Sequence, residues 1–160
     1  MLIGLDPLLN GDVLAVLRDM GHGDSVVLAD ANFPAHYLGP PAIRIDSDAV
    51  RAGRAVLSVM PLDGFVDAPV RRMEADGRPK EPNEAHSEFA AMVADVAGPW
   101  PMGSIERFRF YEEARACVAV FATLELRPYA NFILTKGVIA PDGSVVRPER
   151  PVRRPKGLRP

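Results

Sequence analysis

The fold of this chain is decided by residues 20–38, which read Met20-Gly-His-Gly-Asp-Ser-Val-Val-Leu-Ala-Asp-Ala-Asn-Phe-Pro-Ala-His-Tyr-Leu38. The short apolar run at 26–29 has the length and the β-branched start of a buried strand. Polar residues gather at both of its ends. His22 precedes the run between two glycines, which let a ligand approach the main chain closely. Asp30 follows it, at the end of a strand where open α/β sheets usually bind ligands. The stretch therefore predicts a strand that carries a site.

Helical and strand patterns alternate along the rest of the chain. Apolar residues at spacings of three and four predict helices over about 8–20, 48–60, 84–97 and 108–115. Helix caps are expected at Asn10 or Asp12, at Asp46 or Ser47, and at Asn83. Strands are expected over about 26–29, 42–45, 65–73, 117–124 and 131–139. Such alternation of helices with buried strands predicts a single α/β layer structure.

The composition is typical of one globular domain. The chain has 160 residues, of which 48% are apolar and 25% charged, and a core of that size needs no disulfides or metals. Its net charge of -2 argues against a nucleic-acid-binding protein. The single cysteine, Cys117, lies in an apolar run and is expected to be a small buried thiol. Because neither a signal peptide nor a membrane-spanning run is recognisable, we expect a cytoplasmic protein.

The last twenty residues differ from the rest. Residues 141–160 contain five prolines, five arginines and one lysine against two acidic residues. Such a segment cannot form a packed core, so we expect a domain over residues 1–140 and an extended or mobile tail over 141–160. A basic tail can bind nucleic acid or anionic lipid, but a solvated terminus is the favoured interpretation.

The motifs of most common enzymes are missing from the sequence. It has no glycine-rich phosphate loop with a lysine, no dinucleotide fingerprint and no Gly-x-Ser-x-Gly elbow. The three histidines lack the close His/Cys spacing of a zinc site. An oxygen-rich metal site made from Asp24, Asp30 and Asp46 is a weaker alternative. Acid-base chemistry or binding is what remains.

His22 is the residue best suited to proton transfer, because imidazole titrates near neutral pH and the flanking glycines leave its ring room to meet a ligand. The alternative is a loop histidine that caps the end of the preceding helix. Asp30 can accept hydrogen bonds from two sugar hydroxyls or can cap the following turn. Phe33 can stack on the apolar face of a sugar or can line the core.

A second informative stretch is Arg107-Phe-Arg-Phe-Tyr-Glu-Glu-Ala-Arg115. An arginine there offers a rigid fork of donors for ligand oxygens. Its alternative role is a surface ion pair with Glu112 or Glu113. Tyr129 and Asn131, which enter the last strand, supply a phenol and an amide that can both donate and accept hydrogen bonds.

Taken together, these segments resemble the RbsD/FucU family of L-fucose mutarotases and D-ribose pyranases. The matching segments are Met20-Gly-His-Gly-Asp24, Ala29-Asp-Ala-Asn-Phe-Pro-Ala-His36, Arg107-Phe108 with Phe110-Tyr-Glu112, Tyr129 with Asn131, and Lys136-Gly-Val138. They occur in the family's order over residues 1 to about 139. Arg107 and the Phe-Tyr-Glu that follows make the fucose branch the closer match.

The resemblance implies a cytoplasmic monosaccharide mutarotase that needs no cofactor and no metal. Its subunit would be a layered αβα structure with a mostly parallel sheet, in a ring-shaped homo-oligomer, often a decamer, with no nucleic-acid or membrane partner. The same resemblance implies that His22 is the proton donor and that Asp30, Arg107, Tyr129 and Asn131 hold the sugar. The alternatives are a D-ribose pyranase and a sugar-binding module without turnover.

Two expectations concern the geometry of this site. Asp30 comes eight positions after His22, and at roughly 3.3 Å per strand residue the two lie more than about 15 Å apart if the chain is extended. Either the Gly-His-Gly loop folds back, or each pocket combines groups from two subunits, which is the interpretation we favour. In addition, Ala130 stands where the family usually has glycine. If that position has a positive φ, Ala130 will shift the loop.

Overall fold

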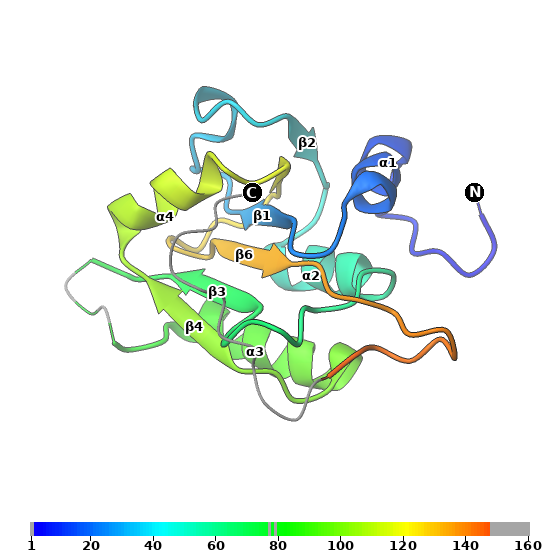
Figure 1. Cartoon of the computed structure of the whole chain (residues 1–160). Coiled ribbons are helices and arrows are strands. Elements are labelled where there is room, and N and C mark those ends of the chain that lie inside the picture. Colours follow the sequence, from blue (N-terminus) through cyan, green and yellow to red (C-terminus); the bar gives the residue numbers. More distant parts are fainter. Residues whose placement is uncertain (1, 77, 79, 148–160) are drawn as a thin grey trace.

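Six strands form one mixed sheet in the order β2-β5-β1-β6-β3-β4 in the computed structural model, which describes residues 2–76, 78 and 80–147 (Figure 1). The strands are β1 (Ser25–Ala29), β2 (Ala42–Arg44), β3 (Val70–Met73), β4 (Met102–Ile105), β5 (Ala119–Ala122) and β6 (Phe132–Thr135). β6 runs antiparallel to both of its neighbours, β1 and β3, whereas the other pairs are parallel. The expected mostly parallel sheet is therefore confirmed.

Helices cover both faces of the sheet. They are α1 (Gly11–Asp19), α2 (Ala49–Leu57), α3 (Glu84–Ala97), α4 (Arg107–Ala114) and the short 3-10 helix η1 (Ala35–Tyr37). One apolar cluster joins α1, α2 and α3 to one face, and a second joins α4 and η1 to the other. Figure 1 shows α4 on the opposite side of the sheet from α2 and α3. The layered αβα fold expected from the sequence is confirmed.

The central strand β1 explains why both layers form. Val26 and Leu28 point into the cluster beneath α1, α2 and α3, whereas Val27 and Ala29 point into the cluster beneath α4. All four side chains are fully buried. A strand covered on both faces must be apolar throughout, as this run is. The polar residues His22 and Asp30 lie beyond the two ends of this strand.

Short polar residues correctly predicted two of the three expected helix caps. Asn10 accepts a hydrogen bond from the Val13 backbone at 3.0 Å, and Asn83 accepts one from the His86 backbone at 2.9 Å, so both expected caps are confirmed. The cap of α2 is Asp48, not Asp46 or Ser47, and it accepts from Arg51 at 2.8 Å. Several short polar residues in a row compete for that position, and their spacing alone does not choose between them.

The strands are shorter than expected, and one was missed. The predicted strands at 65–73, 117–124 and 131–139 shrink to β3, β5 and β6. The missed strand is β4, which contains Gly103 and Ser104 and lies at the edge of the sheet beside β3 alone. A short edge strand with small residues carries almost no periodic apolar signal.

Residues 141–147, the described part of the expected tail, turn back onto the domain. Ile139 and Val145 form an isolated antiparallel bridge, and the Val146 backbone donates to Val138 at 2.9 Å. The Arg147 guanidinium lies 4.0 Å from the centre of the Trp100 ring and donates to the carbonyl of Ala97. Residues 148–160, where most of the expected extended segment falls, lie outside the described residues.

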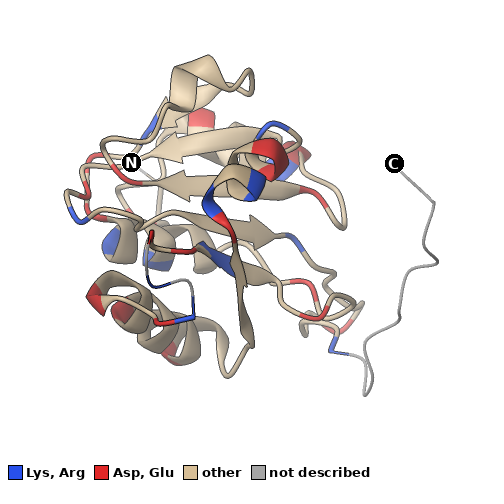
Figure 2. Ribbon diagram, turned by 90° about the vertical axis from the view of Figure 1, so that its left-hand side faces the viewer, with Lys and Arg blue, Asp and Glu red and all other residues tan. Residues whose placement is uncertain are grey.

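Two smaller expectations concern Cys117 and the membrane. The Cys117 thiol is buried, at 8% exposure, so the expected buried thiol is confirmed, and burial raises its pKa to about 12. None of the helices in the described ranges has both the length and the apolar character needed to span a bilayer. Lys and Arg are interspersed with Asp and Glu over the helices and loops (Figure 2).

Candidate functional site

The site forms where one loop crosses the carboxyl end of β1. β5 and β6 lie on either side of β1 in the sheet, so the connection between them must pass over it. We call this connection, residues 123–131, the pocket loop. Hydrogen bonds tie it to the chain beneath: Thr123 donates to the Ala29 carbonyl through Oγ1 at 2.8 Å and through its backbone at 2.9 Å, and the Ala31 backbone donates to Glu125 at 2.8 Å. The crossing brings Asp30 beside Tyr129 and Asn131, which are about a hundred residues away in sequence.

Asp30 and Asn131 form a buried, doubly hydrogen-bonded pair. The Asp30 backbone donates to Asn131 Oδ1 at 2.8 Å, and Asn131 Nδ2 donates to Asp30 Oδ2 at 2.8 Å. The other carboxylate oxygen, Oδ1, accepts from the Asn32 backbone at 2.9 Å, so the expected turn cap at Asp30 is also present. Burial raises the pKa of Asp30, and hydrogen bonds from Asn32, Asn131 and Tyr129 oppose that rise. The carboxylate is fixed in place and keeps acceptor capacity for a ligand.

These residues line a polar cavity of about 160 Å³. Its walls are formed by Asp30, Asn32, Phe33, Met73, Arg107, Tyr111, Pro128, Tyr129 and Asn131. All four residues predicted to hold a sugar, Asp30, Arg107, Tyr129 and Asn131, therefore line one cavity. A carboxylate, an amide, a guanidinium and two phenols around a small space suit a ligand rich in hydroxyl groups.

Arg107 reaches the cavity from the first residue of α4. Its Nη1 donates to Asp76 at 2.7 Å, and its Nε lies 3.4 Å from the hydroxyl of Tyr111. The alternative ion pair with Glu112 or Glu113 is wrong for Arg107, because Arg109 takes both of those carboxylates. Tyr111 is a wall residue that sequence reasoning missed. The available signal was its position four residues after Arg107, on the same face of the helix.

Phe33 and Met73 supply an apolar wall. The Phe33 ring packs edge-on against Phe110 at 6.0 Å and tilts against Tyr111 at 5.6 Å. Phe33 is 9% exposed, so it belongs to the core and still borders the cavity. The core-lining role of this ring is confirmed, and stacking on a sugar stays a prediction. Such a wall suits the C–H face of a sugar ring.

Tyr129 has an unusual backbone. It has a φ of +64° and is the one residue other than glycine in the left-handed region among those the structure describes. Such a conformation typically costs about 1–3 kcal/mol and persists only where its surroundings hold it. The loop shift that a positive φ at Ala130 would cause does not arise at that position. Ala130 is fully buried without a positive φ, and Tyr129 makes the turn instead.

His22 lies at the other end of β1. Its Nε2 is 3.1 Å from Oδ1 of Asp63, and its side chain is 41% exposed while that of Asp63 is fully buried. Oδ1 of Asp63 also accepts from the Phe65 backbone at 2.9 Å, and the Phe65 ring lies 5.1 Å from the imidazole. The imidazole is thus held by a buried carboxylate and still faces outward. Sequence reasoning missed Asp63, which is 41 positions away.

His22 does not cap the helix before it. The carbonyls at the end of α1 are instead satisfied by Lys136, whose Nζ donates to Leu17 at 2.7 Å and to Met20 at 2.6 Å. The turn that presents His22 is therefore fixed by Lys136, which directly follows β6.

A second hollow, of about 380 Å³, opens beside Gly23 and is lined in part by Asp67, Arg71 and Thr135.

His22 and Asp30 do not meet within one chain. Ser25 pairs with Thr135 at the start of β1, and Leu28 pairs with Phe132 near its end, so the two site residues flank opposite ends of the same ladder. Folding back of the Gly-His-Gly loop, the first of the two expected solutions, is therefore wrong for the single chain. The residues predicted to hold the sugar converge, and the predicted proton donor lies apart from them.

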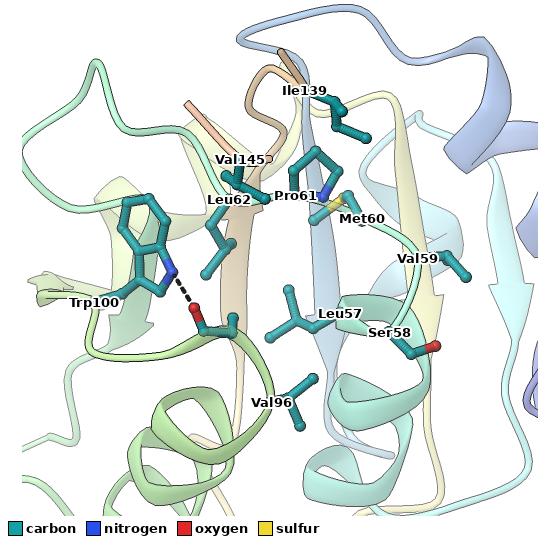
Figure 3. A pocket seen from close by; sticks show the side chains of 11 residues that line it. Leu57, Ser58, Val59, Met60, Pro61, Leu62, Val96, Trp100, Ile139 and Val145 are labelled. Atoms are coloured by element: carbon teal, nitrogen blue, oxygen red, sulfur yellow. Dashed lines mark hydrogen bonds between the residues drawn. The ribbon is translucent and has the colours of Figure 1, made fainter. Parts of the chain in front are cut away.

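Neither an apolar cleft elsewhere nor a metal cluster competes with this site. A cleft of about 260 Å³ between α2, α3 and residues 139–145 is lined mainly by apolar side chains, Trp100 among them, together with Ser58 (Figure 3). None of its lining residues, all within the described ranges, is charged. The weaker metal alternative is wrong: Asp24 accepts from Gly21 at 2.7 Å, Asp46 pairs with Arg44 at 3.6 Å, and no group of three or more potential ligands gathers among the described residues.

Fold and cavity together are those expected of a protein that binds a small, hydroxyl-rich molecule. The chain belongs to the RbsD / FucU transport protein family, whose model matches residues 3–139. The resemblance stated from the sequence is thereby confirmed. The matched region ends before the basic, proline-rich segment.

Two curated relatives and two solved structures illustrate the similarity. An L-fucose mutarotase of Glaesserella parasuis is 38% identical, covering 86% of this chain and 96% of the relative, and the human fucose mutarotase is 40% identical, covering 86% and 94%. The fucose mutarotase of Streptococcus pneumoniae in complex with L-fucose matches with a TM-score of 0.79 at 30% identity, covering 87% of this chain and 100% of that one. Bacillus subtilis RbsD complexed with D-ribose matches with a TM-score of 0.64 at 26% identity, covering 88% and 100%.

The hydrogen bonds to Asp30 lead to a testable prediction. Replacing Asn131 by Ala removes a donor that stabilises the charged carboxylate, so the pKa of Asp30 rises further above its ordinary value. Carbon-detected NMR titration of the side-chain carboxyls measures it. Asn32→Ala is the matched control, because Asn32 donates through its backbone and the pKa of Asp30 should stay where it is. An Asp30 pKa that is the same in wild type and Asn131→Ala contradicts this account of the pair.

Proposed function

We propose that this protein is a sugar mutarotase, an isomerase that interconverts the α and β anomers of L-fucose or a related monosaccharide. The observation that carries the proposal is the convergence of Asp30, Arg107, Tyr129 and Asn131 on one small polar cavity. Support comes from relatives named L-fucose mutarotase or fucose mutarotase, which are 38–40% identical over most of this chain.

Each wall residue has a part in holding the sugar. The Asp30 carboxylate, fixed by Asn131, accepts hydrogen bonds from hydroxyl groups, and the Arg107 guanidinium donates to sugar oxygens. Tyr111 and Tyr129 border the same space and bring hydroxyls that both donate and accept. Phe33 packs against the apolar face of the ring. Together, these hydrogen bonds and the packing of Phe33 hold the sugar in one orientation.

The reaction itself needs only protons. One proton is delivered to the ring oxygen while another leaves the anomeric hydroxyl, which gives the open aldehyde; the aldehyde group rotates and the ring recloses by the reverse steps. Placed acid-base groups contribute about 10²- to 10⁴-fold, and the reaction already proceeds in water. We assign the proton donor to His22, oriented by the buried carboxylate of Asp63 at 3.1 Å. The proposed mechanism uses no cofactor.

We further propose that each working pocket is shared between two subunits of a homo-oligomer. His22 is exposed at one end of β1 and the sugar-holding residues lie at the other, so one chain supplies each half to a different neighbour. A closed ring, such as a decamer, repeats this contact around an axis and leaves no half-site unused. We place the assembly in the cytoplasm. We assign the mutarotase domain to residues 1–140 and regard 141–160 as a separate C-terminal segment, of which residues 141–147 pack back onto the domain.

A D-ribose pyranase, which interconverts pyranose and furanose forms, is the second candidate, supported by the match to RbsD complexed with D-ribose. A sugar-binding module without turnover is the third. Saturation-transfer NMR on L-fucose, D-ribose, D-galactose and L-rhamnose separates them. We expect the largest acceleration of anomer exchange with L-fucose. Fastest exchange between the ring forms of D-ribose favours the pyranase, and ligand shifts without accelerated exchange favour the module.

Mixing two inactive variants tests the shared pocket. We expect His22→Ala and Asn131→Ala each to lose about 100-fold or more of the exchange activity on L-fucose. In a random one-to-one co-assembly, a pocket is intact when one neighbour supplies His22 and the other Asn131. That arrangement has a probability of about one quarter, so about a quarter of the wild-type activity should return.

The control for this experiment is a double variant. Co-assembly of His22→Ala with the His22→Ala, Asn131→Ala double variant restores no intact pocket and should stay inactive. Mixed assemblies of the two single variants that also stay inactive, with subunit exchange verified by mass spectrometry, contradict the shared pocket. A His22→Ala variant with wild-type activity removes the imidazole from the mechanism.

A further inference from the structure

We propose that the first turn of α3, through His86 and Asn83, is the device that positions Tyr129 for sugar binding. The inference rests on the proposed function, because it concerns how the same cavity is held in shape. His86 and Asn83 lie outside the cavity and do not contact a bound sugar, so both are positioning residues. The proposal stands on geometry at the junction of α3 with the pocket loop.

Three consecutive residues of the pocket loop are each tied to α3. Arg127 Nη1 donates to Glu88 at 2.7 Å, and the Pro128 carbonyl accepts from Asn83 Nδ2 at 3.2 Å. The Tyr129 carbonyl is 2.8 Å from Nε2 of His86. Loops are ordinarily the mobile parts of a fold. Here the segment that carries a cavity wall is fixed to one end of a fourteen-residue helix.

The protonation of His86 follows from its other nitrogen. Nδ1 accepts a hydrogen bond from the Asn83 backbone at 3.0 Å, so in the neutral ring Nε2 carries the proton and donates to the Tyr129 carbonyl. The Asn83 side-chain oxygen in turn accepts a hydrogen bond from the His86 backbone at 2.9 Å. The ring is 1% exposed and packs edge-on against Phe132 at 5.9 Å. Because both ring nitrogens are hydrogen-bonded, the imidazole is held in one orientation.

The hydrogen bond from the His86 imidazole restrains the backbone of Tyr129, which has an unfavourable conformation. Tyr129 has a φ of +64°, and a tyrosine without external restraint leaves the left-handed region. Its carbonyl faces His86, and a hydrogen bond from its backbone N–H lowers the pKa of Asp30 on the other side. The backbone of Tyr129 therefore lies between His86, which its carbonyl faces, and the carboxylate assigned to the sugar, which its N–H faces. A change in φ at Tyr129 alters the angle between these two groups and moves the Tyr129 ring.

Two variants of His86 separate this role from simple packing. His86→Phe keeps an aromatic ring against Phe132 and removes the donor to Tyr129. His86→Gln keeps a side-chain N–H at the equivalent reach, and glutamine is accepted at this position of a capped helix. In the full-length assembly, we expect His86→Phe to raise KM for anomer exchange of L-fucose about tenfold with kcat nearly unchanged. His86→Gln should restore KM to within about threefold of wild type.

Ser87→Ala is the matched control. Ser87 belongs to the same turn, its hydroxyl donates only to the Asn83 carbonyl, and its loss should leave KM and kcat unchanged. Should His86→Phe fail to fold, Asn83→Asp replaces it, because aspartate keeps the helix cap and loses the donor to Pro128. We expect a rise in KM of about threefold for that variant.

A backbone readout without sugar keeps the test independent of catalysis. The NMR chemical shifts of Tyr129 report whether its φ is positive, and they should indicate a positive φ in wild type and His86→Gln but not in His86→Phe. A protein with the predicted shifts and no activity overturns the proposed function and leaves the positioning role supported. Wild-type KM in His86→Phe, or a positive φ at Tyr129 in that variant, overturns the positioning role.

Discussion

Two hydrogen bonds between Asp30 and Asn131 hold the functional end of this protein together. A carboxylate this deeply buried is costly unless donors surround it, and the amide of Asn131 supplies one while accepting from the Asp30 backbone. The pair joins the end of β1 to the start of β6, so the loop between β5 and β6 must close over β1. Arg107 and Tyr111, which come from α4, complete the cavity around that closure.

The pocket loop is held from two directions. Beneath it lie the end of β1, where Ala29 accepts from Thr123, and Ala31 just beyond it, which donates to Glu125. Beside it lies the first turn of α3, which is attached to the carbonyls of Pro128 and Tyr129. The strained backbone of Tyr129 is understandable in this setting, because ordered neighbours on both sides supply the restraint. Preorganisation of this kind lowers the entropy lost when a small ligand binds.

The same strand also explains why the proposed chemistry is divided between its ends. β1 is covered on both faces and can carry polar side chains only outside its buried run. His22 and Asp30 occupy those two places. Under the proposed mechanism, the exposed imidazole beside the buried Asp63 needs a sugar-binding surface, and the cavity at Asp30 needs a proton donor. The proposed homo-oligomer would supply both with one repeated contact.

Local patterns predicted what depends on neighbours in sequence. The layered fold, the buried run of β1, and the caps Asn10 and Asn83 all follow from periodicity and short polar residues. The family motifs also named four residues that line one cavity. Long-range partners left no such signal: Asp63 meets His22 across 41 positions, and β4 is short and lies at an edge. The positive φ lies at Tyr129 and not at Ala130, and the Tyr129 carbonyl meets its partner His86 across 43 positions.

The most direct measurement of the central claim is a crystal structure of the assembled protein with L-fucose. The account predicts a sugar whose hydroxyls contact Asp30 and Asn131 of one subunit. Its ring oxygen should lie within about 3.2 Å of the His22 imidazole of a neighbouring subunit. A bound sugar in that cavity with every His22 ring facing bulk solvent, out of reach of the ring oxygen, would contradict it.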